Sequence, residues 1–311
     1  MKLFSGSANP FLAEHIAVEL SVHVSPTDIH VFPDGERRVR LSESVVGENV
    51  VLIQSIASPV DSNYMELFFT IDGAKRSGAE SITAVIPYFG YQRQDHVFRD
   101  GEAVSLEVVV KILESLGITK MISIDMHTPK IPDLFSVPVA HLSALSLFAK
   151  KIQELGWDKE DCVLVSPDMG GIRRIKALSE MLGGMSFAAI EKNRDLESGV
   201  VVSTGFGEGS VAGKKRAIVV DDMVSSGKTL VSAGEVLKQA GIEKMITFAT
   251  HPIFAEDAPE ILEKSLFEKV FVTDTVVVPQ EKQFPKLTIM SVASLIAHEL
   301  KNPTQTNYPL L

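Results

Sequence analysis

The chain has 311 residues, of which 45% are hydrophobic and 23% are charged, and its formal net charge at pH 7 is −10. This length exceeds one ordinary core, so two globular domains are expected. The acidic balance argues against nucleic acid as the main partner, and the single cysteine, Cys162, excludes an internal disulfide framework. No apolar run reaches membrane-spanning length. Because the N-terminus also lacks the apolar core of a signal peptide, we expect a cytoplasmic protein.

The first half of the chain reads as alternating strands and helices. Strands are expected at residues 2–5, 28–32, 38–42, 49–54, 81–88 and 120–125, and helices at residues 11–20, 64–75 and 105–116. Asn9 followed by Pro10 is a typical helix start, and Gly117 is a typical helix end. The sequence Pro33-Asp34-Gly35-Glu36 indicates a turn that joins two strands into a hairpin.

The second half repeats this order of elements. Strands are expected at residues 161–166, 186–191, 200–204, 217–220 and 246–250, and helices in the segment up to residue 182 and at residues 230–240 and 291–300. The repetition suggests a duplicated α/β domain, although any succession of strand–helix units produces similar patterns. We expect one domain over residues 1–143, a second over residues 144–300, and a polar tail over residues 301–311.

The hairpin turn of the first half carries Phe32, Asp34 and Glu36. An exposed phenylalanine ring can stack on a nucleotide base, while the two acids accept hydrogen bonds from an exocyclic amine. The alternative is an ordinary hairpin turn with solvated acids.

Further polar residues follow other expected strands. Arg93, Gln94 and Asp95 follow strand 81–88, where a guanidinium can hold phosphate oxygens through two parallel hydrogen bonds. Asp125 ends strand 120–125 and His127 follows it, while Asp168 follows strand 161–166; such groups are candidate contacts to Mg²⁺ or to nucleotide phosphates. Lys192 and Arg194 begin a polar connector, where two cations can neutralise a phosphoryl group in its transition state. The alternatives are a solvated loop for the segment with Arg93, a structural histidine for His127, and a solvated run of charges for Lys192 and Arg194.

Residues 217–229 read as a strand buried on both faces, two adjacent carboxylates, and a short loop before a helix. The carboxylates are Asp221 and Asp222, and the loop residues are Ser225, Ser226, Gly227, Lys228 and Thr229. Such a loop can direct several N–H groups and hydroxyls at one anion. The neighbouring carboxylates suit sugar hydroxyls or a cation, and together with the anion site they predict a phosphorylated sugar as the ligand. A P-loop is disfavoured because that motif needs glycine at the position of Asp222, and solvated acids on an ordinary strand–turn–helix remain an alternative.

In this order, these segments resemble the ribose-phosphate diphosphokinase family, also called phosphoribosyl diphosphate (PRPP) synthetases, over nearly the whole chain. The matching segments are Phe4-Ser5-Gly6-Ser7, Phe32-Pro33-Asp34-Gly35-Glu36, Arg93-Gln94-Asp95, Asp125-Met126-His127, Ser166-Pro167-Asp168, Lys192 with Arg194, and Asp221-Asp222. The resemblance implies an α/β fold of two duplicated phosphoribosyltransferase-type, Rossmann-like domains with mainly parallel central sheets. It also implies a Mg²⁺-dependent transfer of the diphosphoryl group of ATP to the C1 hydroxyl of ribose 5-phosphate, which gives PRPP and AMP.

The resemblance assigns roles residue by residue. It places Phe32, Asp34, Glu36, Arg93, Gln94 and Asp95 at ATP, His127 and Asp168 at Mg²⁺, Lys192, Arg194 and His127 in catalysis, and Asp221, Asp222, Ser225, Ser226, Gly227, Lys228 and Thr229 at ribose 5-phosphate. It further implies a homo-oligomer, a dimer or a hexamer, in which the hairpin of one subunit completes the ATP site of its neighbour. Neither nucleic acid nor a membrane is expected as a partner.

The chain departs from the family pattern in the ribose 5-phosphate loop. Ser225 and Ser226 stand where the family has an aspartate and a threonine, and Lys228 stands where it has a glycine. Backbone N–H groups do much of the binding in such loops, so the site is expected to persist, with Lys228 adding a cation or reshaping the turn. Family members regulated by phosphate and ADP carry arginines at the positions of Val46 and Gly101, so ADP is not expected to inhibit at that allosteric site.

Two other functions are compatible with the same fold. One is a phosphoribosyltransferase that consumes PRPP, which the paired domains and the Arg93 and Lys192 segments disfavour. The other is a non-catalytic regulatory subunit of a PRPP synthetase. The joint presence of His127, Lys192, Arg194 and both loop carboxylates disfavours that second function.

Overall fold

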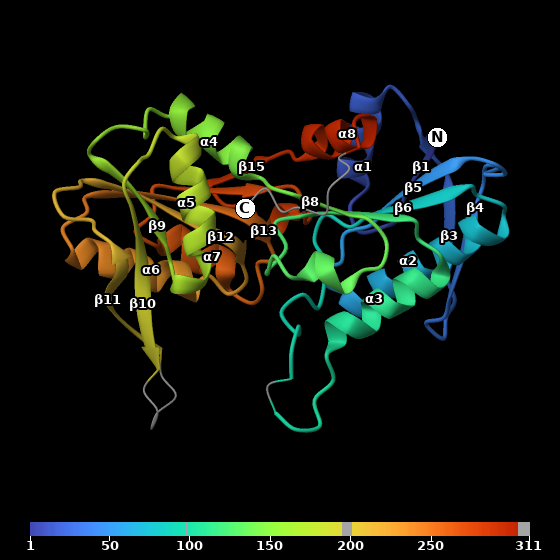
Figure 1. Cartoon of the computed structure of the whole chain (residues 1–311), viewed down its shortest axis with the longest axis horizontal. Helices are drawn as coiled ribbons and strands as arrows, with labels where there is room; N and C mark the ends of the chain where they lie inside the picture. The colour runs from blue at the N-terminus through green and yellow to red at the C-terminus, as the bar shows by residue number, and fades with distance from the viewer. Residues whose placement is uncertain (98, 195–200, 304–311) are drawn as a thin grey trace. The chain divides into compact units, whose positions relative to one another are not determined.

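The computed structural model describes residues 1–97, 99–194 and 201–303, with only the backbone given for residues 192–194 and 201–204. The chain forms two compact units (Figure 1). Unit 1 comprises Met1–Ser143, Thr275–Val277 and the segment from Ser291 onward, and unit 2 comprises Ala144–Asp274 and Val278–Met290. Most of the tail expected over residues 301–311 lies outside the described residues.

Unit 1 is built on a six-stranded parallel sheet with the strand order β2-β1-β5-β6-β7-β8. Its elements are β1 (Lys2–Ser5), α1 (Pro10–Leu20), β2 (Val24–Ser25), β3 (Thr27–Val31), β4 (Arg37–Leu41), β5 (Asn49–Ile53), α2 (Val60–Arg76), β6 (Ser81–Val85), α3 (Ser105–Leu116), β7 (Lys120–Ile124), η1 (Ile131–Leu134), β8 (Val139–Leu142) and α8 (Ala293–Lys301). Helices α1 and α8 lie on one face of the sheet, and α2 and α3 lie on the other (Figure 1). Strands β3 and β4 form a separate antiparallel hairpin, as the turn signal predicts.

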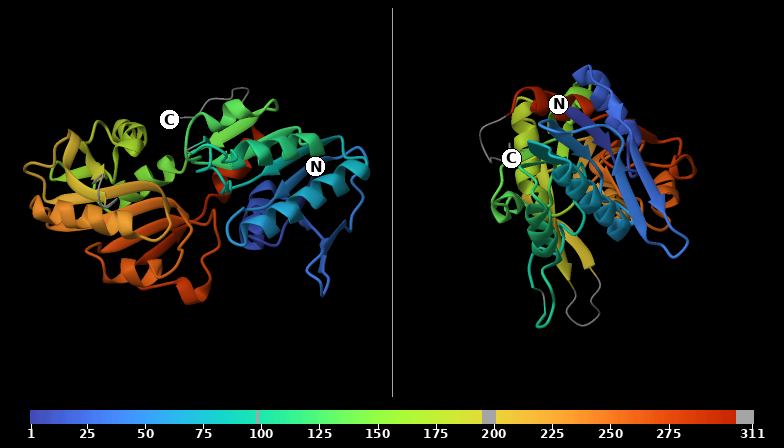
Figure 2. Two further views of the ribbon diagram at one scale, coloured as in Figure 1. Left: turned by 90° about the horizontal axis from the view of Figure 1, so that it is seen from below. Right: turned by 90° about the vertical axis from the view of Figure 1, so that its right-hand side faces the viewer.

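Unit 2 contains a seven-stranded sheet with the order β11-β10-β9-β12-β13-β14-β15, which is parallel apart from the antiparallel pair β10–β11. Its elements are α4 (Leu145–Glu154), β9 (Cys162–Ser166), η2 (Met169–Gly171), α5 (Ile172–Met181), β10 (Phe187–Arg194), β11 (Val201–Gly209), β12 (Arg216–Val224), α6 (Lys228–Gln239), β13 (Lys244–Pro252), α7 (Ala258–Lys264), β14 (Lys269–Thr273), η3 (Gln280–Lys282) and β15 (Leu287–Met290). Helices α4 and α5 cover one face of this sheet, and α6 and α7 cover the other (Figure 2, left).

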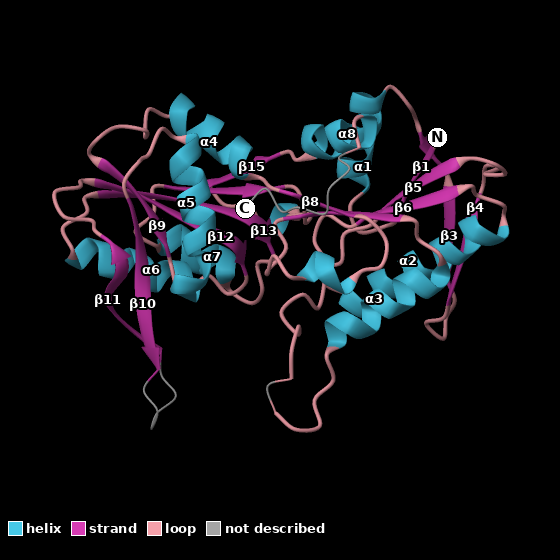
Figure 3. Cartoon of the chain, viewed as in Figure 1, coloured by secondary structure: helices cyan, strands magenta, loops and turns pink. Residues whose placement is uncertain are grey.

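The two units repeat one topology. In unit 1, strands β1, β5, β6, β7 and β8 are adjacent in that order, and β9, β12, β13, β14 and β15 follow the same pattern in unit 2. Each unit also places an antiparallel hairpin before the second strand of this series (Figure 3). The expectation of two duplicated α/β domains with mainly parallel sheets is therefore confirmed.

The apolar strands of both sheets are buried on two faces, which explains their continuous hydrophobic sequences. Phe4, Leu52 and Phe89 belong to the core of unit 1, and Val219 and Phe254 belong to the core of unit 2. In the parts of the chain that the structure describes, no helix has the length and apolar character needed to cross a membrane.

Two segments differ from the sequence-based expectation. Helix α8 belongs to unit 1, whereas residues 144–300 were expected to form one domain. The reason is long-range contact: Glu299 of α8 accepts a bond of 2.6 Å from Lys120, and Lys301 donates to the carbonyl of Glu19 at the end of α1. Strand β12 also continues to Val224 instead of ending at residue 220, because β13 extends equally far and pairs with it up to Pro252.

Candidate functional site

The end of β12 carries the side chains of Asp221 and Asp222. Arg174, from α5, approaches both carboxylates, with Nη1 3.5 Å from Oδ1 of Asp221 and Nη2 3.8 Å from Oδ2 of Asp222. Burial, followed by the charge of Asp222, raises the pKa of Asp221 well above its ordinary value, while Arg174 acts in the opposite direction. The two adjacent carboxyl groups present oxygens with which neighbouring sugar hydroxyls can form hydrogen bonds.

Residues 225–229 form the loop after β12 and the first turn of α6. Gly227 is the N-cap residue and has a φ of 76°, in the left-handed region that glycine favours. Because Gly227 has no side chain, the cap residue itself supplies no acceptor to the first N–H groups of this helix. Lys228 and Thr229 are exposed, and Ser225 and Ser226 are half-buried. This arrangement suits a phosphate group.

Asp168 follows β9, the strand that pairs with β12. Its Oδ1 accepts hydrogen bonds from the N–H groups of Gly170 and Gly171 at 3.0 and 3.3 Å, so it caps η2. Its charge also contributes to the raised pKa of Asp221. The structure thus brings Asp168 into electrostatic contact with the carboxylate pair.

The residues assigned to Mg²⁺ fit that ion unequally. Among the described residues there is no group of three or more His, Cys, Asp or Glu side chains placed to hold a metal. Mg²⁺ usually keeps several waters and binds through one or two carboxylates together with substrate phosphates. Asp168 and the carboxylates of β12 supply ligands of that kind, whereas the imidazole of His127 is not a preferred Mg²⁺ ligand.

The two expected catalytic cations, Lys192 and Arg194, have side chains that lie outside the described part of the chain. Their backbone forms the end of β10 and pairs with β11, where Lys192 lies opposite Ser203 and Arg194 opposite Val201. The polar connector was expected to begin at residue 192, so the strand is longer than its sequence suggests.

In unit 1, the tip of the β3–β4 hairpin presents the expected base-contacting residues. Phe32 is 39% exposed and packs edge-on against His30, with ring centroids 4.6 Å apart. Asp34 accepts from the N–H of Glu36 at 3.1 Å, and both acids are exposed. The tip is therefore a preformed turn with an accessible ring. Figure 1 shows this hairpin and the long loop after β6 as separate projections.

The loop after β6 contains Arg93 and Gln94, both exposed, and Asp95, which pairs with His96 at 2.7 Å. The preceding residues fix its course. Tyr91 has a φ of 63°, its ring stacks on Tyr64, and its hydroxyl donates to Asp61. The guanidinium of Arg93 is accordingly displayed on an anchored loop.

His127 lies next to this loop, because its backbone N–H donates to Oε1 of Gln92 at 2.9 Å. The loops after β6 and β7 are therefore joined, and the expected ATP residues Arg93, Gln94 and His127 lie in one region of unit 1. Asp125, in contrast, is buried and accepts from the hydroxyl of Ser143 at 2.8 Å. Its role in the structure is to hold the loop after β7.

Sequence reasoning missed Arg174 and Gln92. Arg174 had a usable signal, because Arg173 and Arg174 lie in the first turn of a helix, where the helix dipole disfavours cations unless an acid is near. Gln92 had none: it lies in a polar loop, and only the folded chain shows that it is 1% exposed and bonded to residue 127.

The chain matches two family models. Residues 1–117 match the N-terminal domain of ribose phosphate pyrophosphokinase, and residues 207–306 match the phosphoribosyl synthetase-associated domain. A ribose-phosphate pyrophosphokinase from Fusobacterium nucleatum is 34% identical over 98% of this chain and 95% of its own length. Ribose-phosphate pyrophosphokinase 1 from Streptococcus pyogenes is 35% identical over 96% of this chain and 93% of its own. The crystal structure of phosphoribosylpyrophosphate synthetase from Mycobacterium smegmatis superposes with a TM-score of 0.89 and 36% identity, covering 96% of this chain and 97% of that one.

Proposed function

The chain belongs to the ribose-phosphate pyrophosphokinase family, and from this premise we propose that it makes PRPP and AMP from ribose 5-phosphate and ATP. The anomeric oxygen of ribose 5-phosphate attacks the β-phosphorus of ATP. The bond from that phosphorus to the oxygen bridging the α- and β-phosphates breaks, AMP leaves with that oxygen, and the anomeric proton passes to solvent. No covalent enzyme intermediate is needed, so the protein contributes positioning and charge neutralisation.

The ribose 5-phosphate end of the reaction is assigned to unit 2. The loop from Ser225 to Thr229 and the first N–H groups of α6 bind the 5-phosphate. Asp221 and Asp222 bind the ribose hydroxyls, and Arg174 keeps the two carboxylates in place. This combination of a phosphate-binding helix start and an adjoining carboxylate pair is the observation that carries the proposal.

The ATP end is assigned to unit 1. Arg93 and Gln94 bind the phosphates together with His127, whose backbone Gln92 fixes. Phe32, Asp34 and Glu36 bind the adenine ring, and in a homo-oligomer they serve the site of a neighbouring subunit. Lys192 and Arg194 neutralise the charge that develops on the transferred group.

Mg²⁺ would bind with the polyphosphate of ATP and would supply charge neutralisation there. Asp168 and the β12 carboxylates are the protein groups that would hold it. Asp168 is suited to this task because its cap on η2 restricts its side chain before any ligand binds.

The direct test uses the purified full-length chain with ATP, Mg²⁺ and ribose 5-phosphate, and measures AMP and PRPP by chromatography. We expect equal amounts of both products, and neither when ribose replaces ribose 5-phosphate. Absence of AMP under these conditions would reject the proposal and favour a regulatory subunit. Consumption of added PRPP in the presence of a free base would instead indicate a phosphoribosyltransferase.

A further inference from the structure

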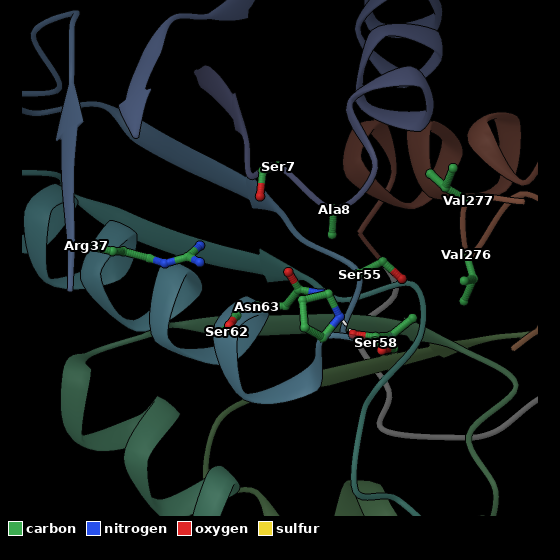
Figure 4. Close-up of a pocket in the computed structure, with 11 residues that line it drawn as sticks. Ser7, Ala8, Arg37, Ser55, Ser58, Ser62, Asn63, Val276 and Val277 are labelled. Carbon is green, nitrogen blue, oxygen red and sulfur yellow. Dashed lines mark hydrogen bonds between the residues drawn. The ribbon is translucent and has the colours of Figure 1, made fainter. Parts of the chain in front are cut away.

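Unit 1 contains a polar cavity that none of the assigned ATP residues line. Its volume is about 300 Å³, at the lower end of the range for small-ligand sites. The polar side chains that line it are those of Ser7, Arg37, Ser55, Ser58, Ser62 and Asn63 (Figure 4).

The position of this cavity repeats that of the loop assigned to ribose 5-phosphate in unit 2. Ser7 follows β1, and Ser55 follows β5, its parallel neighbour in the sheet. In unit 2, Asp168 follows β9, and the phosphate loop follows β12, which is likewise the parallel neighbour of β9. Helix α2 begins after the loop that contains Ser55, as α6 begins after the loop that follows β12. The duplicated topology therefore gives each unit one polar site at the same place.

Arg37 supplies the positive charge of the cavity. Its Nη1 donates to Oε2 of Glu66 at 2.6 Å, and Glu66 is only 1% exposed. Glu66 also accepts from the N–H and hydroxyl of Ser7 at 2.6 and 2.8 Å, and from Nε2 of Gln54 at 2.9 Å. Four donors thus compensate this carboxylate, which fixes the guanidinium at the cavity wall. A guanidinium has five N–H donors, so one bond to Glu66 leaves others for an anion.

The lining also includes serine hydroxyls and the start of a helix. Ser58 and Ser62 line the cavity, and Ser62 lies in the first turn of α2, a helix of 17 residues whose N-cap residue, Pro59, makes no side-chain capping bond. The hydroxyl of Ser7 donates to Glu66, and that of Ser55 donates to the carbonyl of Thr275 at 2.5 Å. Since these two hydroxyl protons are already used, the two oxygens can serve a ligand only as acceptors.

We propose that this cavity is a second phosphate site, which binds a phosphate monoester or inorganic phosphate through Arg37, Ser58, Ser62 and the start of α2. The hydroxyl oxygens of Ser7 and Ser55, which line the same cavity, can accept from hydroxyl groups of a sugar or polyol that carries the phosphate. The ligand class is therefore a phosphorylated sugar or polyol, or free phosphate as its smallest member.

The test is isothermal titration calorimetry of the full chain with inorganic phosphate, ribose 5-phosphate and ribose, each alone. Arg37→Gln and Ser62→Val remove donors from the cavity, and Arg38→Gln is the matched control, because Arg38 pairs with Asp28 on the hairpin and does not line the cavity. We expect both cavity variants to weaken one binding phase by about 10-fold, as for loss of a hydrogen bond to a charged group, and Arg38→Gln to leave it unchanged. Ser62→Val leaves all the hydrogen bonds to Glu66 in place, so this variant still tests the proposed phosphate site if Arg37→Gln fails to fold.

The three ligands separate the sources of the phosphate. A variant-sensitive phase seen with inorganic phosphate supports a free-phosphate site, and one seen only with ribose 5-phosphate supports a sugar-phosphate site. The proposal is overturned if Ser62→Val binds both compounds with wild-type affinity and stoichiometry, or if ribose alone produces the same phase. The KM for ribose 5-phosphate, which reports on the loop in unit 2, should stay the same in Ser62→Val.

Discussion

Burial and the charge of Asp222 raise the pKa of Asp221 in the folded chain. The folded protein therefore holds this proton more tightly than the unfolded chain does, and stability falls as the pH rises from the ordinary aspartate range towards the raised pKa. We expect Asp221→Asn to be more stable than the wild type at neutral pH, with the difference vanishing towards about pH 4. Thermal unfolding of both proteins, measured from about pH 4 to neutral pH, tests this prediction.

Asp161→Asn is the control for that measurement. Arg216 bonds to Asp161 and lowers the pKa of this carboxyl, so its ionised form stabilises the folded chain. The substitution should therefore lower stability at neutral pH, the opposite sign. Equal responses of both variants would show that removal of any negative charge stabilises this acidic chain, and would contradict the specific role of burial at Asp221.

Lys192 is expected to act in the transition state. Lys192→Ala should lower kcat by about 100-fold or more, since one charge-stabilising group typically contributes this much, while the melting temperature stays unchanged. Lys238→Ala, on the exposed face of α6, is the control. Steady-state rates of AMP formation decide the outcome, and a near-normal rate for Lys192→Ala would remove this residue from the mechanism.

The helix α6 is bounded by two glycines with left-handed backbone, Gly227 at its start and Gly241 after its end, with φ values of 76° and 89°. Alanine at either position should cost about 1 kcal/mol of stability, because the left-handed region is unfavourable for residues with a Cβ. Only Gly227→Ala changes the loop that we assign to the 5-phosphate, so only this variant should raise the KM for ribose 5-phosphate, by about 10-fold. If Gly241→Ala raises KM equally, the effect comes from general destabilisation of the helix.

The elements around this site also show how far sequence reasoning reaches. Local signals predicted the start of α1. Asn9 accepts from the N–H of Leu12, and Pro10, which has no N–H, stands at the first helical position, where an N–H would find no acceptor within the helix. The extension of β12 to Val224 had no local signal, since it depends on pairing with β13. The same reason hid Arg174, whose partners lie about 50 residues further along the chain, on β12.

At the scale of the whole molecule, the two-domain pattern was readable because each domain repeats its own strand–helix order. The unit to which α8 belongs could not be predicted from the sequence, because nothing in the sequence of a C-terminal helix indicates which sheet it packs against. The buried carboxylate of Glu299, on α8, forms an ion pair with Lys120 of unit 1, which lies more than half the chain away in sequence. Sequence order thus predicts elements well, and long-range ion pairs decide which unit the last one joins.

The proposed sharing of the ATP site between subunits can be tested by mixing two defective proteins. One carries Phe32→Ala with Asp34→Ala at the hairpin tip, and the other carries Lys192→Ala; each alone is expected to be nearly inactive. If the hairpin serves a neighbouring subunit, random co-assembly places both lesions in one site and leaves about a quarter of the sites intact, as closed symmetric assembly requires. The measurement is AMP formation after the two proteins are denatured together, refolded and assayed, compared with each refolded alone. If the hairpin serves its own subunit, every site keeps one lesion and no activity returns, so the absence of recovery from a mixture that has formed hetero-oligomers would contradict a shared site.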